Sequence, residues 1–179
     1  LPVHDIDFAV SASPEETKRL LSPFAKMIDT GLKFGTVTAV FEGVPFELTT
    51  FRADCGIKDG RHPQSVSFVR DIVSDLSRRD FTVNAMAWSP EKGLVDPFGG
   101  REDITKRLIR CVGEPSLRFE EDALRILRSL RFMSRLGFRL DDETAKALRQ
   151  NAFRLKTISR ERIFSELSGI ICGKNACDT

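Results

Sequence analysis

The sequence lacks several features that define common classes of protein. It has no apolar run near the ~20 residues that a membrane-spanning helix needs, and no secretory signal pattern. None of the four cysteines belongs to a CxxC pair or to a metal-site spacing. The two histidines, His4 and His62, also lack the spacing of zinc ligands. These absences argue against a membrane protein and a zinc protein, and they favour reduced thiols in a cytoplasmic protein.

The chain also lacks a strong excess of charge. Its 179 residues carry 28 basic and 26 acidic side chains, a net charge of +2. A general attraction to nucleic acid is therefore weak, and any RNA contact depends on local clusters of charge. One such cluster contains Arg118, Arg125, Arg128, Arg131, Arg135 and Arg139. With 41% hydrophobic and 30% charged residues, the chain has the composition of a globular protein with one or two compact units.

The first half of the chain mixes strand and helix signals. Residues 5–10 are typical of a strand, and Ser13 with Glu16 forms a capping box that opens a helix ending near residue 21. Residues 35–41 and 46–51 flank Glu42-Gly43 and predict a β-hairpin. The polar, turn-rich residues 53–67 predict a surface loop.

Helix and strand signals stay mixed up to about residue 110, and the remainder of the chain is predicted to be helical. A helical signal starts near residue 71 and continues through Trp88, and residues 93–100 resemble a strand end followed by a turn. A strong helix at 120–136 is stopped by Gly137. The remaining helices are expected at 101–107, 142–150 and 159–172. The mixed and helical parts meet near residue 113.

Three acidic residues are the first candidates for chemistry. Side chains alternate along a strand, so Asp5 and Asp7 would point to one side while Ile6 enters the core. A second β-like run would bring Glu47 alongside them. Converging carboxylates are unstable at neutral pH without a cation, and Mg²⁺ prefers such oxygen ligands. The alternative is an acidic surface turn without a function.

The arginine cluster is the second candidate. At 100° per residue, Arg125, Arg128, Arg131 and Arg135 occupy about one third of a helix circumference. An ordinary solvated basic face is one interpretation of this pattern. Four arginines without interleaved acids would repel one another, which favours an anionic partner instead.

Asp122 and Arg125 suggest a way to select bases. They are three residues apart, so on a helix they would be neighbours, and an ordinary ion pair is one interpretation. Asp only accepts hydrogen bonds and Arg only donates them. Side by side, they could match the amino donor and ring-nitrogen acceptor of cytosine or adenine. Uracil and guanine present the reverse order and would leave buried groups unpaired.

Together these residues resemble the class II tRNA nucleotidyltransferases, the CCA-adding enzymes of bacterial and eukaryotic type. The stretches that carry the resemblance follow the order of that family along nearly the whole chain. They are Asp5–Val10, Gly35–Val40, Phe46–Arg52, Arg61–Pro63, Asp75–Ala87, Val95–Gly100, Glu121–Arg125, Leu130–Phe132 and Glu161–Arg162. Each stretch alone is weak evidence, but the ordered set is specific.

The resemblance implies an α+β fold: a nucleotidyltransferase-type mixed β-sheet head domain followed by an all-helical neck domain. The head would occupy residues 1–112, with its amino-terminal part missing, and the neck residues 113–179. The implied reaction is template-independent, Mg²⁺-dependent addition of C, C and A from CTP and ATP to the 3′ end of tRNA, with release of pyrophosphate. The body and tail helices of full-length members, which hold tRNA, are absent from this chain.

The resemblance also assigns roles to the acidic candidates. Asp5 and Asp7 would bind the metal ions, and Glu47 would be the third catalytic carboxylate. Two Mg²⁺ ions would lie among them, one activating the RNA 3′-hydroxyl and one holding the triphosphate. In the family, a Gly-Gly-x-Val-Arg-Asp turn that helps hold the triphosphate comes just before these residues. The given sequence begins at Leu1-Pro2 and does not include this turn.

Basic and base-reading roles follow in the same way. Arg79 would contact the bound nucleotide, and Asp122 and Arg125 would form the base-reading pair. Arg128 and Arg131 would contact phosphates or ribose. Three alternatives remain at this level: a poly(A) polymerase, a sister enzyme that adds only CC or only A, or a catalytically silent RNA-binding fragment.

Overall fold

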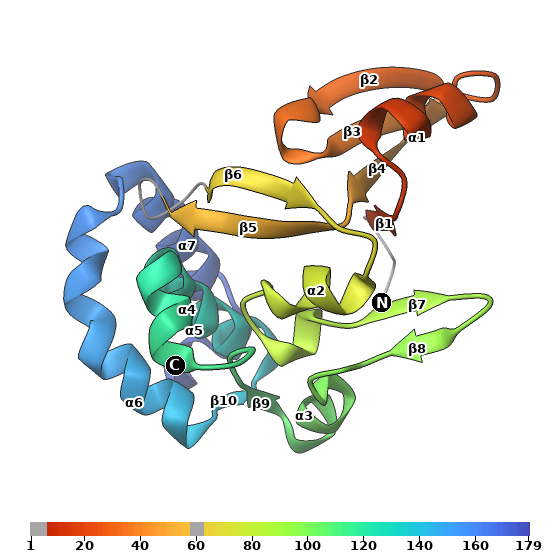
Figure 1. The fold of residues 1–179 in the computed structure, drawn as a ribbon. Coiled ribbons are helices and arrows are strands. Elements are labelled where there is room, and N and C mark those ends of the chain that lie inside the picture. Colours follow the sequence, from red (N-terminus) through yellow and green to blue (C-terminus); the bar gives the residue numbers. More distant parts are fainter. Residues whose placement is uncertain (1–6, 58–62) are drawn as a thin grey trace. The chain divides into compact units, whose positions relative to one another are not determined.

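The computed structural model describes residues 7–57 and 63–179, in two compact units. Unit 1 comprises residues 1–56 and 64–78, and unit 2 comprises residues 57–63 and 79–179. Strands dominate unit 1 and helices dominate unit 2 (Figure 1). The predictions made for His4, Asp5, Ile6 and His62 fall outside the described residues.

Unit 1 is built on a four-stranded mixed sheet with the order β1-β4-β3-β2. Its strands are β1 (Asp7–Val10), β2 (Lys26–Gly31), β3 (Thr36–Phe41) and β4 (Val44–Thr50). Strand β1 runs parallel to β4, whereas the other two pairs are antiparallel. Positive φ angles at Glu42 (49°) and Gly43 (83°) form the tight turn that a two-residue hairpin requires. The predicted hairpin is therefore confirmed.

The helix predicted after the first strand is also confirmed. Helix α1 (Pro14–Leu21) begins after Ser13, whose hydroxyl accepts a hydrogen bond from the backbone N–H of Glu16. The Glu16 carboxylate in turn accepts from the backbone N–H of Ser13. This reciprocal cap satisfies two backbone donors that the first turn would otherwise leave unpaired.

The sheet of unit 1 has one apolar and one polar face. Val37, Ala39 and Leu48 are buried on the apolar face, where residues of α1 and the following loop pack against them. The opposite face carries Asp7 and Glu47 together with a row of threonines. Two threonine pairs bond across neighbouring strands on that face: Thr36 with Thr49, and Thr30 with Thr38. The period-two alternation of these strands thus separates a core from a polar surface.

One prediction for unit 1 is wrong, and one strand was missed. Strand β2 was not foreseen, and the expected loop at 53–67 instead contains strands β5 (Arg52–Ile57) and β6 (Pro63–Phe68), which pair as a two-stranded sheet. Residues 52–57 include Asp54 and Gly56, which are poor strand formers, so local propensity hid the strand. Pairing between segments, rather than a local pattern, produces this structure.

Helix α2 (Ile72–Ser77) belongs to unit 1 and ends earlier than predicted. The longer segment of unit 2 follows it. Residues 78–88 do not continue as an α-helix: Phe81 has an extended backbone (φ −127°, ψ 150°) and forms a β-bridge with Cys111. The elements that follow are η2 (Thr82–Asn84), β7 (Ala87–Ser89), β8 (Gly93–Val95), α3 (Gly100–Lys106), β9 (Leu108–Ile109), α4 (Pro115–Glu121), α5 (Leu124–Leu136), β10 (Arg139–Leu140), α6 (Asp142–Asn151), η3 (Ala152–Thr157), α7 (Arg160–Ile171) and η4 (Ala176–Asp178).

The two glycines after Phe98 have separate structural reasons. Gly99 has a φ of 74°, which favours a residue without a side chain at the start of α3. A Cβ atom on Gly100 would lie 2.1 Å from the carbonyl oxygen of Thr82, so only glycine allows α3 to approach η2 this closely. The turn and short helix predicted for this region are confirmed.

One apolar core joins the helices of unit 2 to its short strands. Phe81, Ile109 and Phe119 are fully buried and pack together with Ile126. Burial of each such side chain contributes roughly 2–3 kcal/mol to folding. The predicted domain boundary near residue 113 falls between members of this core, so the division into a head at 1–112 and a neck at 113–179 stays a prediction.

The strong helix predicted at 120–136 is interrupted. Helix α4 ends at Glu121, and Asp122 has an extended backbone (φ −148°, ψ 105°). The Asp122 carboxylate then accepts a hydrogen bond from the N–H of Leu124, the first residue of α5. The apolar residues keep a helical spacing across this break, and Asp can cap a helix start as well as lie within a helix. The sequence pattern therefore did not reveal the break. Gly137 ends α5 with a φ of 66°, as predicted.

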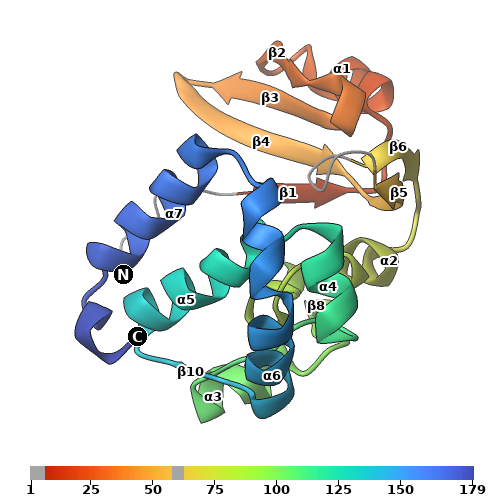
Figure 2. The same cartoon turned by 90° about the vertical axis from the view of Figure 1, so that its left-hand side faces the viewer.

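The last predicted helices are confirmed as α6 and α7. Figure 2 shows α7 running alongside α5, and the two helices pack closely. At Gly169 of α7, a Cβ atom would lie 2.6 Å from Cδ of Arg131 on α5, which explains why a glycine stands there. Among the described residues, no helix is long and apolar enough to cross a membrane.

Candidate functional site

Asp7 and Glu47 lie opposite each other on the polar face of unit 1. They are register partners on the parallel strands β1 and β4, so their side chains leave the sheet on the same side. Both residues are exposed. Within residues 7–57 and 63–179, neither carboxylate has an ion-pair or hydrogen-bond partner. We call these two residues the carboxylate pair; their open oxygens are the type of ligand that Mg²⁺ prefers.

The structure therefore brings together two of the three predicted acidic residues. Asp5, the third, lies outside the described residues, and within the described part no group of three acidic, histidine or cysteine side chains could hold a metal. The two open carboxylates fit a hard divalent cation by the chemistry of their donors. Their role as metal ligands stays a prediction.

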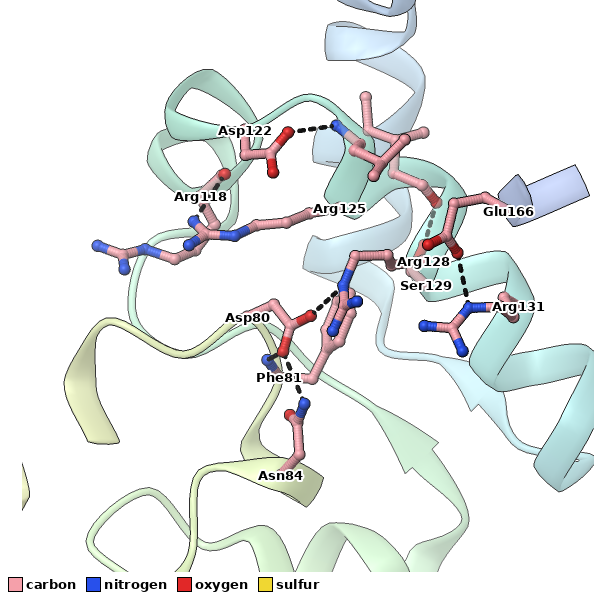
Figure 3. A network of polar contacts seen from close by, with 12 residues as sticks. Asp80, Phe81, Asn84, Arg118, Asp122, Arg125, Arg128, Ser129, Arg131 and Glu166 are labelled. Carbon is pink, nitrogen blue, oxygen red and sulfur yellow. Dashed lines mark hydrogen bonds and ion pairs between the residues drawn. The ribbon is translucent and has the colours of Figure 1, made fainter. Parts of the chain in front are cut away.

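In unit 2, Arg125, Arg128 and Arg131 lie along α5, and we call them the arginine face. Each has an acidic partner. Figure 3 shows the two partners that come from distant segments, Asp80 and Glu166. Arg125 Nη1 lies 2.6 Å from Glu121 Oε2 and also donates to the carbonyl of Arg118. The missing acids that suggested an anionic partner are thus supplied by the fold itself.

Arg128 and Arg131 each bind their acidic partner through their own Nε atom. Nε of Arg128 donates to Oδ2 of Asp80 at 2.7 Å, and Nε of Arg131 donates to Oε2 of Glu166 at 2.6 Å. The side chains of Asp80 and Glu166 are only 7% and 11% exposed, so both ion pairs are shielded from water. Figure 3 shows Asp80 between Arg128 and Asn84, whose amide nitrogen donates to Oδ1 of Asp80 at 2.8 Å.

Asp122 lies at the break between α4 and α5 rather than on a helix. One of its oxygens caps α5, and the other accepts from Nη2 of Arg162 on α7 at 3.0 Å. Asp122 and Arg125 are still one turn apart, since the N–H of Arg125 donates to the carbonyl of Asp122. A carboxylate has about four acceptor positions, so two used positions leave capacity for a further donor.

Arg79 lies two residues beyond the end of α2 and directly precedes Asp80. It is half-buried. Its neighbour Asp80 binds Arg128 of α5, so two of the predicted nucleotide-contact positions are linked through one short segment of unit 2.

Sequence reasoning missed the partners of these residues. Asp80, Glu121, Arg162 and Glu166 orient the predicted site residues but were assigned no role. Two signals were available: Glu121 lies four residues before Arg125, and Arg162 and Glu166 are four apart and therefore share a face of α7. The contacts of Asp80, Arg162 and Glu166 with the predicted site residues span 35 to 48 residues and are invisible in a local pattern.

The fold and its side chains define a class. A mixed sheet with a carboxylate pair, followed in the chain by helices with an arginine face, is the predicted α+β fold of a nucleotidyltransferase-type head with helical elements after it. Residues 1–110 match the sequence family described as Poly A polymerase head domain, and residues 137–179 match one described as Probable RNA and SrmB- binding site of polymerase A. The chain belongs to the poly(A) polymerase head domain family.

Curated relatives are CCA-adding enzymes. The enzyme of Geobacillus thermodenitrificans is 49% identical over 177 residues, which cover 99% of this chain and 43% of the relative. The enzyme of Lactobacillus helveticus is 49% identical over 164 residues, covering 92% of this chain and 40% of the relative. The resemblance found in the sequence is thereby confirmed, and the chain spans less than half the length of these relatives.

Solved structures give the same result. The Bacillus stearothermophilus CCA-adding enzyme in complex with CTP matches with a TM-score of 0.87 at 46% identity, over 99% of this chain and 42% of that one. The Thermotoga maritima CCA-adding enzyme complexed with tRNA matches with a TM-score of 0.77 at 29% identity, over 98% of this chain and 40% of that one.

Proposed function

We propose that this chain forms the catalytic and base-selecting part of a CCA-adding enzyme. The reaction joins C, C and A from CTP and ATP to the 3′ end of tRNA and releases pyrophosphate. The observation that carries the proposal is the match of nearly the whole chain to curated CCA-adding enzymes, combined with the carboxylate pair on the polar face of unit 1. The free thiols of Cys111, Cys172 and Cys177 fit a reducing cytoplasmic location.

The carboxylate pair is proposed to hold Mg²⁺, with Asp5 as a further ligand. When bound there, the cation supplies charge neutralisation to the triphosphate and lowers the pKa of the attacking hydroxyl. Asp7 and Glu47 contribute by offering open oxygens on one side of the sheet. The RNA 3′-oxygen forms a bond to the α-phosphorus of the nucleotide, and the bond to the β-phosphate oxygen breaks as pyrophosphate leaves.

The residues of unit 2 are proposed to hold and select the nucleotide. Asp122 accepts a hydrogen bond from the amino group of cytosine or adenine, while Arg125 donates to the neighbouring ring nitrogen. Arg79, Arg128 and Arg131 bind phosphate or ribose oxygens. Selection follows from polarity, because uracil and guanine place an acceptor opposite Asp122 and leave it unpaired.

The proposal is tested by sequencing reaction products. The full-length protein is incubated with Mg²⁺, all four nucleoside triphosphates and tRNA that lacks its 3′ end. Addition of C, C and A followed by a stop is the expected result. Addition of CC alone, A alone or a long A tail would preserve the chemistry and change the product. No addition under conditions where the protein binds tRNA would contradict the proposal and support a silent RNA-binding protein.

A further inference from the structure

Phe132, a residue of α5 with no role assigned so far, lies between the core of unit 2 and the arginine face. Its half-buried ring packs against the core cluster that contains Phe81 and Ile109. The rings of Phe81 and Phe132 meet edge to face, with centroids 5.6 Å apart and an interplanar angle of 78°. Phe81 is fully buried. The ring of Phe132 is therefore fixed from the inside.

Two arginines of the arginine face contact this same ring. Cζ of Arg128 lies 5.9 Å from the centroid of Phe132, and Cζ of Arg131 lies 5.3 Å from it. Both distances fall within the ~6 Å at which a cation is attracted to an aromatic face. Arg128 and Phe132 are four residues apart, so the helix itself places them together. A single ring therefore contacts both guanidinium groups.

The ring complements the two ion pairs described above. Asp80 and Glu166 each bind only the Nε atom of their arginine. Among the described residues, the Nη atoms of Arg128 and Arg131 have no hydrogen-bond partner. A guanidinium fixed at Nε and at its face can turn little, and its Nη donors remain available for oxygen acceptors of a ligand.

We propose that Phe132 is a positioning residue: it orients Arg128 and Arg131 so that their Nη donors are directed at the phosphate or ribose oxygens of the bound nucleotide. This inference rests on the proposed function for its ligand. Because the ring is not charged, it restrains both arginines without neutralising them. Loss of the ring should weaken nucleotide binding while leaving base choice unchanged, since the ring contacts Arg128 and Arg131, whereas base choice is proposed to depend on Asp122 and Arg125.

The first test compares Phe132→Leu, Phe132→Tyr and Phe164→Leu in the full-length protein. Leucine keeps the apolar packing and removes the aromatic face, whereas tyrosine keeps the face. Phe164 on α7 is 73% exposed and has no aromatic or cation contact within the described residues, so Phe164→Leu is the matched control. KM for CTP and ATP, kcat and nucleotide choice are measured for each variant.

Phe132→Leu should raise KM for both CTP and ATP about 5- to 30-fold, the equivalent of two cation–π contacts. Base choice should not change, and kcat should change much less than KM. Phe132→Tyr should restore KM to within about threefold, and Phe164→Leu should match wild type. An unchanged KM in Phe132→Leu, or equal losses in the leucine and tyrosine variants, would overturn the inference.

A second measurement separates this inference from the proposed function. If the wild-type protein transfers no nucleotide, the proposed function fails, but the arginine positions can still be read by NMR. The Nε–H signals of Arg128 and Arg131 should show ring-current shifts and slow exchange in wild type and in Phe132→Tyr, and lose both in Phe132→Leu. Signals that do not change in Phe132→Leu would overturn the positioning role.

Discussion

The carboxylate pair of unit 1 and the arginine face of unit 2 differ in whether the fold compensates their like charges. Asp7 and Glu47 are exposed register partners, and no cation from the described residues approaches them. Arg125, Arg128 and Arg131 each have an acidic partner at 2.6–2.7 Å, and Arg131 is only 18% exposed. One site leaves its charge uncompensated, and the other compensates its charge within the fold.

The difference indicates what each site requires from a ligand. Neighbouring carboxylates gain stability from a cation that arrives from solution, which is consistent with the proposed binding of a metal ion by the pair. Arginines that are already paired with acids gain less from an anion's charge and more from being held in one orientation. The first site should therefore depend on a metal ion, and the second on the acids and the ring that orient it.

The largest expected effect is a loss of activity without a loss of stability when the carboxylate pair is changed. Asp7→Asn or Glu47→Gln should reduce transfer of both CTP and ATP by about 10³-fold, because a proposed metal ligand is lost. Stability should stay equal or rise by a few tenths of a kcal/mol, since a like-charge repulsion disappears. Initial rates and urea unfolding of the same samples measure the two quantities.

Glu15→Gln is the matched control for those variants. Glu15 is an exposed acid in the first turn of α1, where it favours the helix dipole. This change should therefore lower stability by a few tenths of a kcal/mol and leave activity intact. If Asp7→Asn transferred nucleotide at a rate near that of wild type, the carboxylate pair would not be the catalytic site.

A loss of stability is expected instead at the buried pair Arg131–Glu166. Glu166→Met leaves Arg131 buried without its acid and should lower the free energy of unfolding by about 3 kcal/mol. Combining it with Arg131→Met should recover most of this loss, because two methionines pack without an unpaired charge. In contrast, Asp29→Ala removes the exposed Lys18–Asp29 pair of unit 1 and should cost less than about 1 kcal/mol.

Chemical denaturation of the three variants and of wild type measures these differences. Equal losses from Glu166→Met and Asp29→Ala would mean that the ion pairs of unit 2 are no better shielded than a surface pair. The ion pairs of the two units would then differ only in their position in the sequence.

Base selection should show a smaller, more specific effect. Asp122→Asn replaces a group that only accepts by an amide that also donates, so uracil and guanine gain a partner. Incorporation of U and G relative to C and A should rise about 10- to 100-fold, with total activity less affected. Glu120→Gln is the control, because Glu120 is an exposed acid nearby that pairs with Arg154. Unchanged selection in Asp122→Asn would remove Asp122 from base reading.

The sequence was sufficient where local chemistry determines structure. The capping box of Ser13 and Glu16, the hairpin around Glu42 and the stop at Gly137 each depend on a few adjacent residues. Alternation along strands also predicted that Asp7 would lie beside Glu47, because the two runs had to bury their apolar sides. These features need no knowledge of distant contacts.

The sequence was insufficient where distant segments determine structure. The break at Asp122 is stabilised by Arg162, forty residues away along the chain, and the course of the chain at Phe81 is set by its bridge to Cys111. The paired strands β5 and β6 likewise contain poor strand formers. The acids that hold Arg128 and Arg131 come from other elements, so a local count of charge could not find them.

The smallest expected effect concerns the buried, uncharged thiol of Cys111. Burial in the core of unit 2 raises the pKa of the Cys111 thiol to about 12. An unfolded thiol releases its proton near pH 9, so the folded state binds one more proton between about pH 9 and 12. Stability should therefore fall as pH rises through this range, with a slope of up to ~1.4 kcal/mol per pH unit from this group. Urea unfolding between pH 8 and about 10.5 measures the slope.

Cys111→Ala should flatten that dependence even though it lowers stability overall, and Cys172→Ser should leave it unchanged because Cys172 is exposed. Equal slopes in wild type and Cys111→Ala would show that the thiol is not protected. In that case the core of unit 2 would admit water near the residues that orient Arg128, since Asp80 lies close enough to raise the pKa of Cys111. The shielding of the arginine face would then be weaker than its exposed fractions indicate, and its dependence on salt correspondingly stronger.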